Sequence, residues 1–147
     1  MINNNFEKKL KSEEFVFTAE TSPPDSTVRS EITDRVLCLK DLADAINVTD
    51  GASAKSHLSS LVVSSIIKDI EIEPILQLTT RDRNRIAIQS DLLGAWTLNI
   101  QNILCIYGDQ VETGDQPETK EVRDLDTLGV ITAVSYTHLR AHETELD

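Results

Sequence analysis

Cysteine, glycine, proline, aromatic residues and positive charge are all scarce in this sequence. Among 147 residues there are two cysteines, five glycines, four prolines and 4% aromatic residues, and the net charge is −11. Cys38 and Cys105 lie in neither a CxxC pair nor a Cys/His cluster, which argues against a disulfide framework or a metal site. We interpret both as small apolar core residues in a reducing compartment. The negative charge argues against nucleic acid and anionic membranes as partners, because both attract basic surfaces.

Long apolar runs and targeting segments are also missing. No run approaches the roughly 18 apolar residues of a membrane span, and the N-terminal MINNNFEKKLKSEE lacks the apolar stretch of a secretory signal. These absences predict a cytoplasmic protein that does not associate with membranes. What is present, 39% apolar and 27% charged residues, is typical of one globular domain with its own core.

Predicted strands and helices alternate along the chain. A short polar helix or a frayed arm is expected within residues 3–14. The strands are predicted at 15–20, 46–50, 74–80 and 102–107, and the helices at 28–47, 57–69, 82–99 and 125–133. Such alternation predicts an α/β fold with a parallel sheet and helices outside it. Four βα units are either half of an eightfold barrel or a small open sheet, and the spacing alone does not separate the two.

Particular residues carry some of these expectations. The run Ile103–Tyr107 has no helical spacing and predicts a buried strand that ends at Gly108. A long loop follows it, and Asp124 or Asp126 is expected to cap the last helix. The helix predicted at 28–47 depends on one apolar stripe: Ile32, Val36, Leu39, Ala43 and Ile46.

Each predicted strand ends in polar residues, and parallel strands place such ends at one edge of their sheet. Glu20 precedes a Thr-Ser-Pro-Pro turn, and burial at that edge would favour its protonated form and suit a general acid. The alternative for Glu20 is a surface glutamate at the start of a loop. Asp109 presents a second carboxylate after Gly108. We interpret the strand ends as one site that contains Glu20, Thr49, Asp50, Gln77, Thr79, Thr80, Asp82 and Asp109.

Two parts of this edge have alternative interpretations. The Thr49 hydroxyl can donate to a ring nitrogen or a phosphate, whereas Asp50 is equally explained as a turn residue. The arginines that follow the third strand could meet phosphates beside a helix N-terminus, or could form a solvated basic turn. We favour the solvated turn for Arg83 and Arg85 and leave Arg81 open.

The end of the sequence departs from the pattern. Residues 134–147, VSYTHLRAHETELD, become polar where the last helix needs apolar residues, and SYTHLRAHET resembles translated sequencing-adapter text. We therefore expect the natural chain to continue differently after about Ala133. His138 and His142 have a metal-ligand spacing on a helix, but under this interpretation they are foreign, and no metal site is predicted.

Several segments, taken in order, resemble the methylenetetrahydrofolate reductase family. They are FVFTAETSPP, NVTDGASA, LQLTTRDRNR, SDLLGAW, NILCIYGDQVETGDQP and VRDLDTLGVI, and together they span about Phe15 to Ile131. The resemblance implies a (β/α)8 TIM barrel with FAD at the C-terminal ends of its strands. Residues 1–133 would be the N-terminal half of that barrel, with its first four βα units.

The resemblance also implies the chemistry and the partners. NAD(P)H would reduce FAD, and the flavin would pass a hydride to 5,10-methylenetetrahydrofolate to give 5-methyltetrahydrofolate, a step of one-carbon metabolism that leads to methionine biosynthesis. The nicotinamide preference stays open, and a homo-oligomer of the full-length protein is possible. This piece alone would be inactive, because half of the barrel is missing.

Site residues carry over from the resemblance one by one. Glu20 matches the family glutamate that protonates the substrate, and Asp109 matches the aspartate that faces flavin and pterin. Thr49 matches a flavin-contacting threonine, and Thr79 is a weaker match. Gln77 and Tyr107 stand where many members carry His and Arg, which suggests a divergent branch. The implied cofactor-binding set is Thr49, Gln77, Thr79, Tyr107, Gly108 and Asp109, and the implied catalytic pair is Glu20 and Asp109.

Two other functions fit the same strand ends. A lyase or aldolase on the same barrel would place a Schiff-base lysine or a metal cluster in the missing half. A non-catalytic assembly subunit would keep the fold without reductase activity. Bound flavin and a genomic neighbourhood of one-carbon enzymes would separate these alternatives from the reductase.

Overall fold

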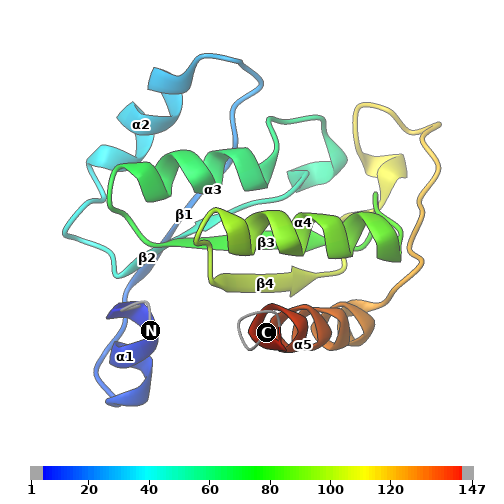
Figure 1. The fold of residues 1–147 in the computed structure, drawn as a ribbon. Helices are drawn as coiled ribbons and strands as arrows, with labels where there is room; N and C mark the ends of the chain where they lie inside the picture. Colours follow the sequence, from blue (N-terminus) through cyan, green and yellow to red (C-terminus); the bar gives the residue numbers. More distant parts are fainter. Residues whose placement is uncertain (1–4, 144–147) are drawn as a thin grey trace.

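A computed structural model describes residues 5–143 of the chain, with side chains described through residue 136. Its centre is a sheet of four parallel strands in the order β1-β2-β3-β4 (Figure 1). The strands are β1 (Thr18–Thr21), β2 (Ala45–Val48), β3 (Pro74–Thr79) and β4 (Asn102–Ile106). The prediction of an α/β fold with four parallel βα units, a partial barrel, is confirmed.

Helices connect and cover these strands. In Figure 1, α3 and α4 cross in front of the sheet, and α5 lies beside β4. Two short 3-10 helices, η1 (Ala52–Ala54) and η2 (Val111–Thr113), lie in the loops after β2 and β4. The α-helices are α1 (Asn5–Lys11), α2 (Arg29–Leu37), α3 (Ser60–Asp69), α4 (Arg85–Thr97) and α5 (Thr127–Glu143).

The apolar core lies on one face of the sheet. Ile46 and Val48 of β2 pack with residues of α2 and α3, while Leu76 and Leu78 of β3 pack against α4. Because side chains alternate along a strand, the residues between them point to the opposite face. That opposite face, called the open face below, carries Glu20, Asn47, Gln77 and Leu104.

Two predicted boundaries near the N-terminus were wrong. The helix predicted at 28–47 ends at Leu37, because Ile46 joins β2, where its amide donates to the Glu73 carbonyl at 2.8 Å. Asp41, with φ of 68°, lies in the turn between them. β1 begins three residues later than expected, because the Phe17 amide donates to the Asp44 carboxylate at 2.8 Å rather than to a ladder partner.

The burial expected of β4 and of the cysteines was also wrong in part. β4 is the edge strand, so its side chains are half-buried, and Leu104 is 43% exposed. Cys105 on this strand packs against the α4–α5 cluster, and burial raises the pKa of its thiol. Cys38 is exposed at the C-cap of α2, where its thiol donates to the Arg35 carbonyl at 3.4 Å.

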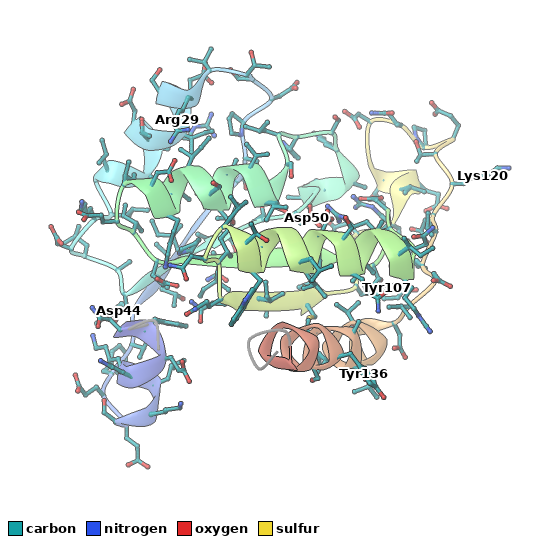
Figure 2. All side chains as sticks on the ribbon, in the orientation of Figure 1. Arg29, Asp44, Asp50, Tyr107, Lys120 and Tyr136 are labelled. Carbon is teal, nitrogen blue, oxygen red and sulfur yellow. The ribbon has the colours of Figure 1, made fainter. Side chains whose placement is uncertain are left out.

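Helix α1 is tied to the N-terminal edge of the sheet by one carboxylate. Asp44 accepts from Lys9 Nζ at 2.7 Å through one oxygen and from the Phe17 amide through the other. The hydrogen bond from Lys9 is the largest cause that lowers the pKa of Asp44. A single side chain therefore joins α1, the approach to β1 and the start of β2 (Figure 2).

Caps define the starts of α4 and α5. Asn84 caps α4 by accepting from the Ala87 amide at 3.0 Å, and Asp126 caps α5 by accepting from the Gly129 amide at 2.7 Å. Asp124, the other predicted cap, accepts from the amide of Arg85 in α4 instead, at 2.9 Å.

The last helix is longer than expected. The backbone of α5 continues past the predicted end at Ala133 to Glu143. His138 and His142 lie outside the residues whose side chains are described. Through the described part of the chain, no helix combines the length and apolar character needed to cross a bilayer.

Candidate functional site

The C-terminal ends of the four strands meet at one edge of the sheet, as the sequence predicts. Strand register aligns Glu20 with Asn47 and Thr79 with Ile106, so the residues that follow each strand form adjacent loops. Every predicted site residue lies on these strand ends or in the loops directly after them.

Glu20 and Gln77 meet across the open face. The Gln77 amide nitrogen donates to Glu20 Oε2 at 3.3 Å, although β2 lies between their strands. Gln77 is buried and Glu20 is exposed. The burial predicted for Glu20 is therefore not found, because β1 is an edge strand.

Thr79 and Gly108 form a close contact in the middle of the edge. Gly108 has φ of +85°, and a Cβ there would lie 3.2 Å from Thr79 Cβ. Thr79 is fully buried, and its hydroxyl has no hydrogen-bond partner among the described atoms. A buried hydroxyl without a partner is uncommon and marks a position where a bound group can supply one. The Thr49 hydroxyl, one strand away, donates to Ser22 Oγ at 3.1 Å.

Asp109 joins the loops after β2 and β4. Its Oδ2 accepts from the backbone amide of Ser53 at 2.7 Å, and its carbonyl accepts from Arg81 Nη1 at 3.3 Å. Ser53 and Ala54 both have φ near +55°, and Gly114 packs so closely on Ala54 that a Cβ would collide with its carbonyl. The Asp109 carboxylate is exposed and therefore available to a ligand through its second oxygen.

Arg123, near the end of the long loop that follows β4, binds the backbone just after that strand. Its guanidinium stacks over the Tyr107 ring, 3.6 Å from the ring centroid, and Nη1 donates to the Tyr107 carbonyl at 2.7 Å. Nη2 donates to the Gly108 carbonyl at 3.4 Å. Arg123 also pairs with Glu121, and their hydrogen bond raises the pKa of Arg123 and lowers that of Glu121. Tyr107 itself is exposed (Figure 2).

A largely buried ion pair, between buried Asp50 and half-buried Arg83, lies beneath this edge. Asp50 accepts two bonds from the Arg83 guanidinium, at 2.6 and 3.2 Å, and others from Ser60 Oγ at 3.1 Å and the Thr79 amide at 2.9 Å. Arg83 also donates to Asp91 at 2.8 Å. Burial opposes the charge on Arg83, but its bonds and attraction to Asp50 and Asp91 outweigh burial and raise its pKa. The solvated turn predicted for Arg83 was therefore wrong.

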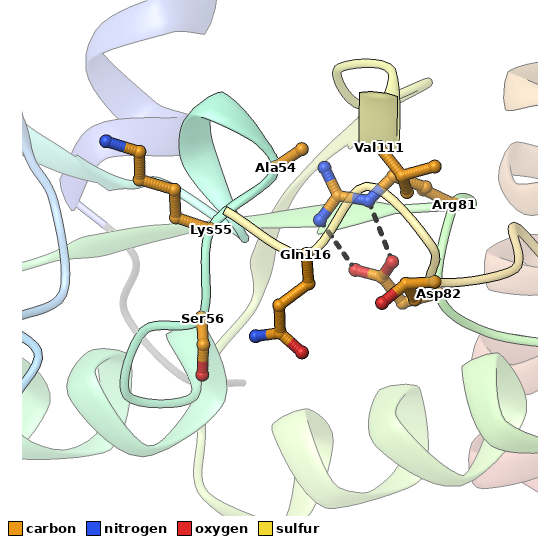
Figure 3. Close-up of a pocket in the computed structure, with 8 residues that line it drawn as sticks. Ala54, Lys55, Ser56, Arg81, Asp82, Val111 and Gln116 are labelled. Atoms are coloured by element: carbon orange, nitrogen blue, oxygen red, sulfur yellow. Dashed lines mark hydrogen bonds and ion pairs between the residues drawn. The ribbon is translucent and has the colours of Figure 1, made fainter. Parts of the chain in front are cut away.

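Arg81 is the most buried charged residue of the edge. Its side chain pairs bidentately with Asp82 at 2.7 and 2.8 Å, and Nη1 donates to the Gly51 carbonyl at 3.2 Å. The bond to Asp82 raises the pKa of Arg81. Figure 3 shows this pair beside a pocket of about 150 Å³ between the loops. The pocket is lined by Ala54, Lys55, Ser56, Arg81, Asp82, Val111, Gln116 and Thr119.

Sequence reasoning missed the residues that hold the loops in place. The sequence alone leaves Arg81 as either a phosphate ligand or a solvated residue, whereas in the structure it ties the ends of three strands together. The pairing of Asp50 with Arg83 had a signal, since opposite charges follow neighbouring parallel strands. Arg123 had none, because it is sixteen residues from the Tyr107 carbonyl that it binds.

Within the described residues, no group of three His, Cys, Asp or Glu side chains is arranged to hold a metal ion. A search of curated proteins found no match. The profile of the methylenetetrahydrofolate reductase family matches residues 5–135, which include all four strands and every loop of the site. The chain therefore belongs to the methylenetetrahydrofolate reductase family.

Proposed function

We propose that this chain is part of a methylenetetrahydrofolate reductase, an FAD-dependent enzyme that uses NAD(P)H to reduce 5,10-methylenetetrahydrofolate to 5-methyltetrahydrofolate. Membership of the family supports an oxidoreductase of folate metabolism in general. The observation that carries the finer proposal is the placement of Glu20, Gln77, Thr79 and Asp109 at or near the C-terminal ends of parallel strands in one sheet, with Gln77 bonded to Glu20. That edge is where barrel enzymes place their chemistry.

The residues at this edge fit a flavin. The buried Thr79 hydroxyl has no described partner, and Gly108, which has no side chain, lets the turn after β4 pack directly on Thr79. Bound there, FAD would supply the carrier for hydride. The residues that would hold it are Thr49, Gln77, Thr79, Tyr107, Gly108 and Asp109.

Glu20 is the proposed acid. Gln77 donates to Oε2 of Glu20, so Oε1 is left to carry the proton. Glu20 would give this proton to the pterin side of the five-membered ring of the substrate. The protonated ring would then open to the reactive iminium. The exposed position of Glu20 leaves it open to a substrate. Asp109, fixed by the Ser53 amide, would hold the folate and would make flavin reduction harder through its negative charge.

The test uses a gene extended to a complete barrel. Purified protein should be yellow with bound FAD and should oxidise NAD(P)H when the folate substrate is added. Glu20→Gln should lower turnover by about 10²-fold or more while FAD remains bound. Full activity in Glu20→Gln would remove the assignment of the acid. Colourless, inactive wild-type protein would favour a lyase, an aldolase or a non-catalytic subunit.

The division of the chain is part of the proposal. Residues 1–133 would be the N-terminal half of the barrel, and residues 134–147 would be foreign adapter-derived sequence. The end of the family match at residue 135 supports this boundary. Sequencing the gene downstream of codon 133 from its source tests it: a continuation with more βα units is expected, and the same VSYTHLRAHETELD text in an intact gene would contradict the proposal.

A further inference from the structure

We propose that Glu121 and Arg123 form a clasp that fixes the turn from Tyr107 to Val111 and thereby sets the position of Asp109. The role of Asp109 toward flavin and folate rests on the proposed function, whereas the clasp itself is a property of this chain. In this view Arg123 is a positioning residue that acts through the turn.

Arg123 binds the side of the turn before Asp109. It donates to the Tyr107 carbonyl at 2.7 Å and to the Gly108 carbonyl at 3.4 Å, and its Cζ lies 3.6 Å from the centroid of the Tyr107 ring. A planar guanidinium can make all of these contacts together, whereas an ammonium cannot. The two peptide groups before Asp109 are thus held by one side chain.

Glu121 binds the side of the turn after Asp109. Its Oε1 accepts from Arg123 Nη2 at 2.8 Å and from the Val111 amide at 3.4 Å, and Oε2 accepts from Arg123 Nε. The clasp is anchored between its two members, where the Val122 amide donates to the Arg81 carbonyl at 2.8 Å. The two side chains therefore bind the backbone on both sides of Asp109, and the segment that carries them is bonded to the end of β3.

The backbone of Arg123 supports a positioning role. Its φ of 38° lies in the left-handed region, which is unfavourable for residues other than glycine, asparagine and aspartate. Such strain persists when surrounding contacts over-determine a conformation, and it is common where geometry matters for function. Here the contacts of the Arg123 side chain to two carbonyls, one ring and one carboxylate supply that constraint.

The test compares three variants of the chain with a matched control. Arg123→Asn keeps a residue that tolerates left-handed φ but removes the guanidinium, so it separates the side-chain contacts from the backbone requirement. Arg123→Lys keeps the charge, and Glu121→Gln removes the other partner. The control is Arg29→Asn, which removes an exposed pair with Asp69 at 2.5 Å, far from the turn.

Two NMR measurements on the labelled 147-residue chain decide the proposal. In Arg123→Asn, amide exchange at 108–111 should become about tenfold faster, and the carboxyl ¹³C signal of Asp109 should move. Arg123→Lys should restore part of both effects, Glu121→Gln should reproduce them, and Arg29→Asn should produce neither. Exchange rates and an Asp109 signal in Arg123→Asn that equal those of Arg29→Asn would overturn the clasp.

A binding measurement addresses the link to the cofactor separately. In the complete protein, Arg123→Asn and Asp109→Asn should each weaken FAD binding by about tenfold, and the double variant should be no weaker than Asp109→Asn alone. Additive losses would show that Arg123 does not act through Asp109. Wild-type protein that binds no FAD would end the proposed function, while the NMR result on the clasp would still stand or fall on its own.

Discussion

The two central strands and the two edge strands of the sheet differ in how firmly they hold their residues. Along β2 and β3 almost every side chain is buried, whereas β1 alternates between exposed and half-buried positions and β4 is half-buried except at the exposed Leu104. Thr49, Gln77 and Thr79 are buried, whereas Glu20 lies on the edge strand β1, Asp109 follows the edge strand β4, and both are exposed. The pair proposed for catalysis therefore depends on loops and cross-strand hydrogen bonds for its placement, and the proposed flavin contacts depend on the core.

The largest effect should come from removing the buried charge between β2 and β3. Asp50→Ala leaves Arg83 without its main partner, and breaking such a pair costs about 3 kcal/mol or more. Urea unfolding monitored by circular dichroism should give this loss in the free energy of unfolding. Asp69→Ala, which breaks the exposed pair with Arg29, should change stability by less than about 1 kcal/mol. Equal effects of the two would contradict the difference in burial.

Truncating one leucine on each type of strand tests the comparison directly. Leu76→Ala removes a fully buried side chain from β3 and should cost about 2–4 kcal/mol. Leu104→Ala removes a side chain of β4 that is 43% exposed and should cost about 1 kcal/mol or less. The same unfolding measurement serves both, and a larger loss for Leu104 would mean that the open face is covered in solution.

Replacing two glycines, one in a turn and one in a helix, should change the stability by a smaller amount. Gly108→Ala should cost about 1–2 kcal/mol, because φ is +85° and the new Cβ would press on Thr79. Gly94→Ala, inside α4 with ordinary contact to Leu61, should gain up to about 1 kcal/mol. Thermal unfolding should therefore move Tm in opposite directions. A neutral Gly108→Ala would show that the end of β4 adjusts freely.

The smallest effect on stability should come from acid, which protonates Asp44 and so breaks the link between α1 and the sheet. The pKa of Asp44 is lowered from its ordinary value of 3.8, chiefly by the hydrogen bond from Lys9. Its contribution to stability is therefore complete above that value and is lost as pH falls through the lower folded value. The amide signal of Phe17 should follow this titration, and Lys9→Gln should move the transition to higher pH. A Phe17 signal that is indifferent to pH between 5 and 2 would contradict the link.

Periodicity and strand ends were sufficient to predict most of the fold. β3 was predicted closely, because Pro74 marks its start, and α4 was predicted within a few residues at each end, because its apolar residues match one helical period. The helix at 28–47 was predicted too long, since Ile46 continues a helical stripe although it pairs in β2. Local pattern does not reveal that a strand partner competes for such a residue.

The candidate site was predictable in position and less so in detail. Glu20, Gln77 and Asp109 could be placed at one edge, because parallel strands bring their ends together. Their partners could not be predicted. The bond from Ser53 to Asp109 depends on two loops 56 residues apart, and the stacking of Arg123 on Tyr107 depends on the path of a long loop. Contacts of this kind leave no periodic trace in the sequence.

The order of the strands has a consequence for synthesis on the ribosome. Since β1, β2, β3 and β4 are neighbours in the order in which they are made, each new strand can dock on the one that left the exit tunnel just before it. Among the four described strands, each one after β1 finds its hydrogen-bonded partner in the strand made just before it. Translation itself can thereby guide assembly from the first unit onward.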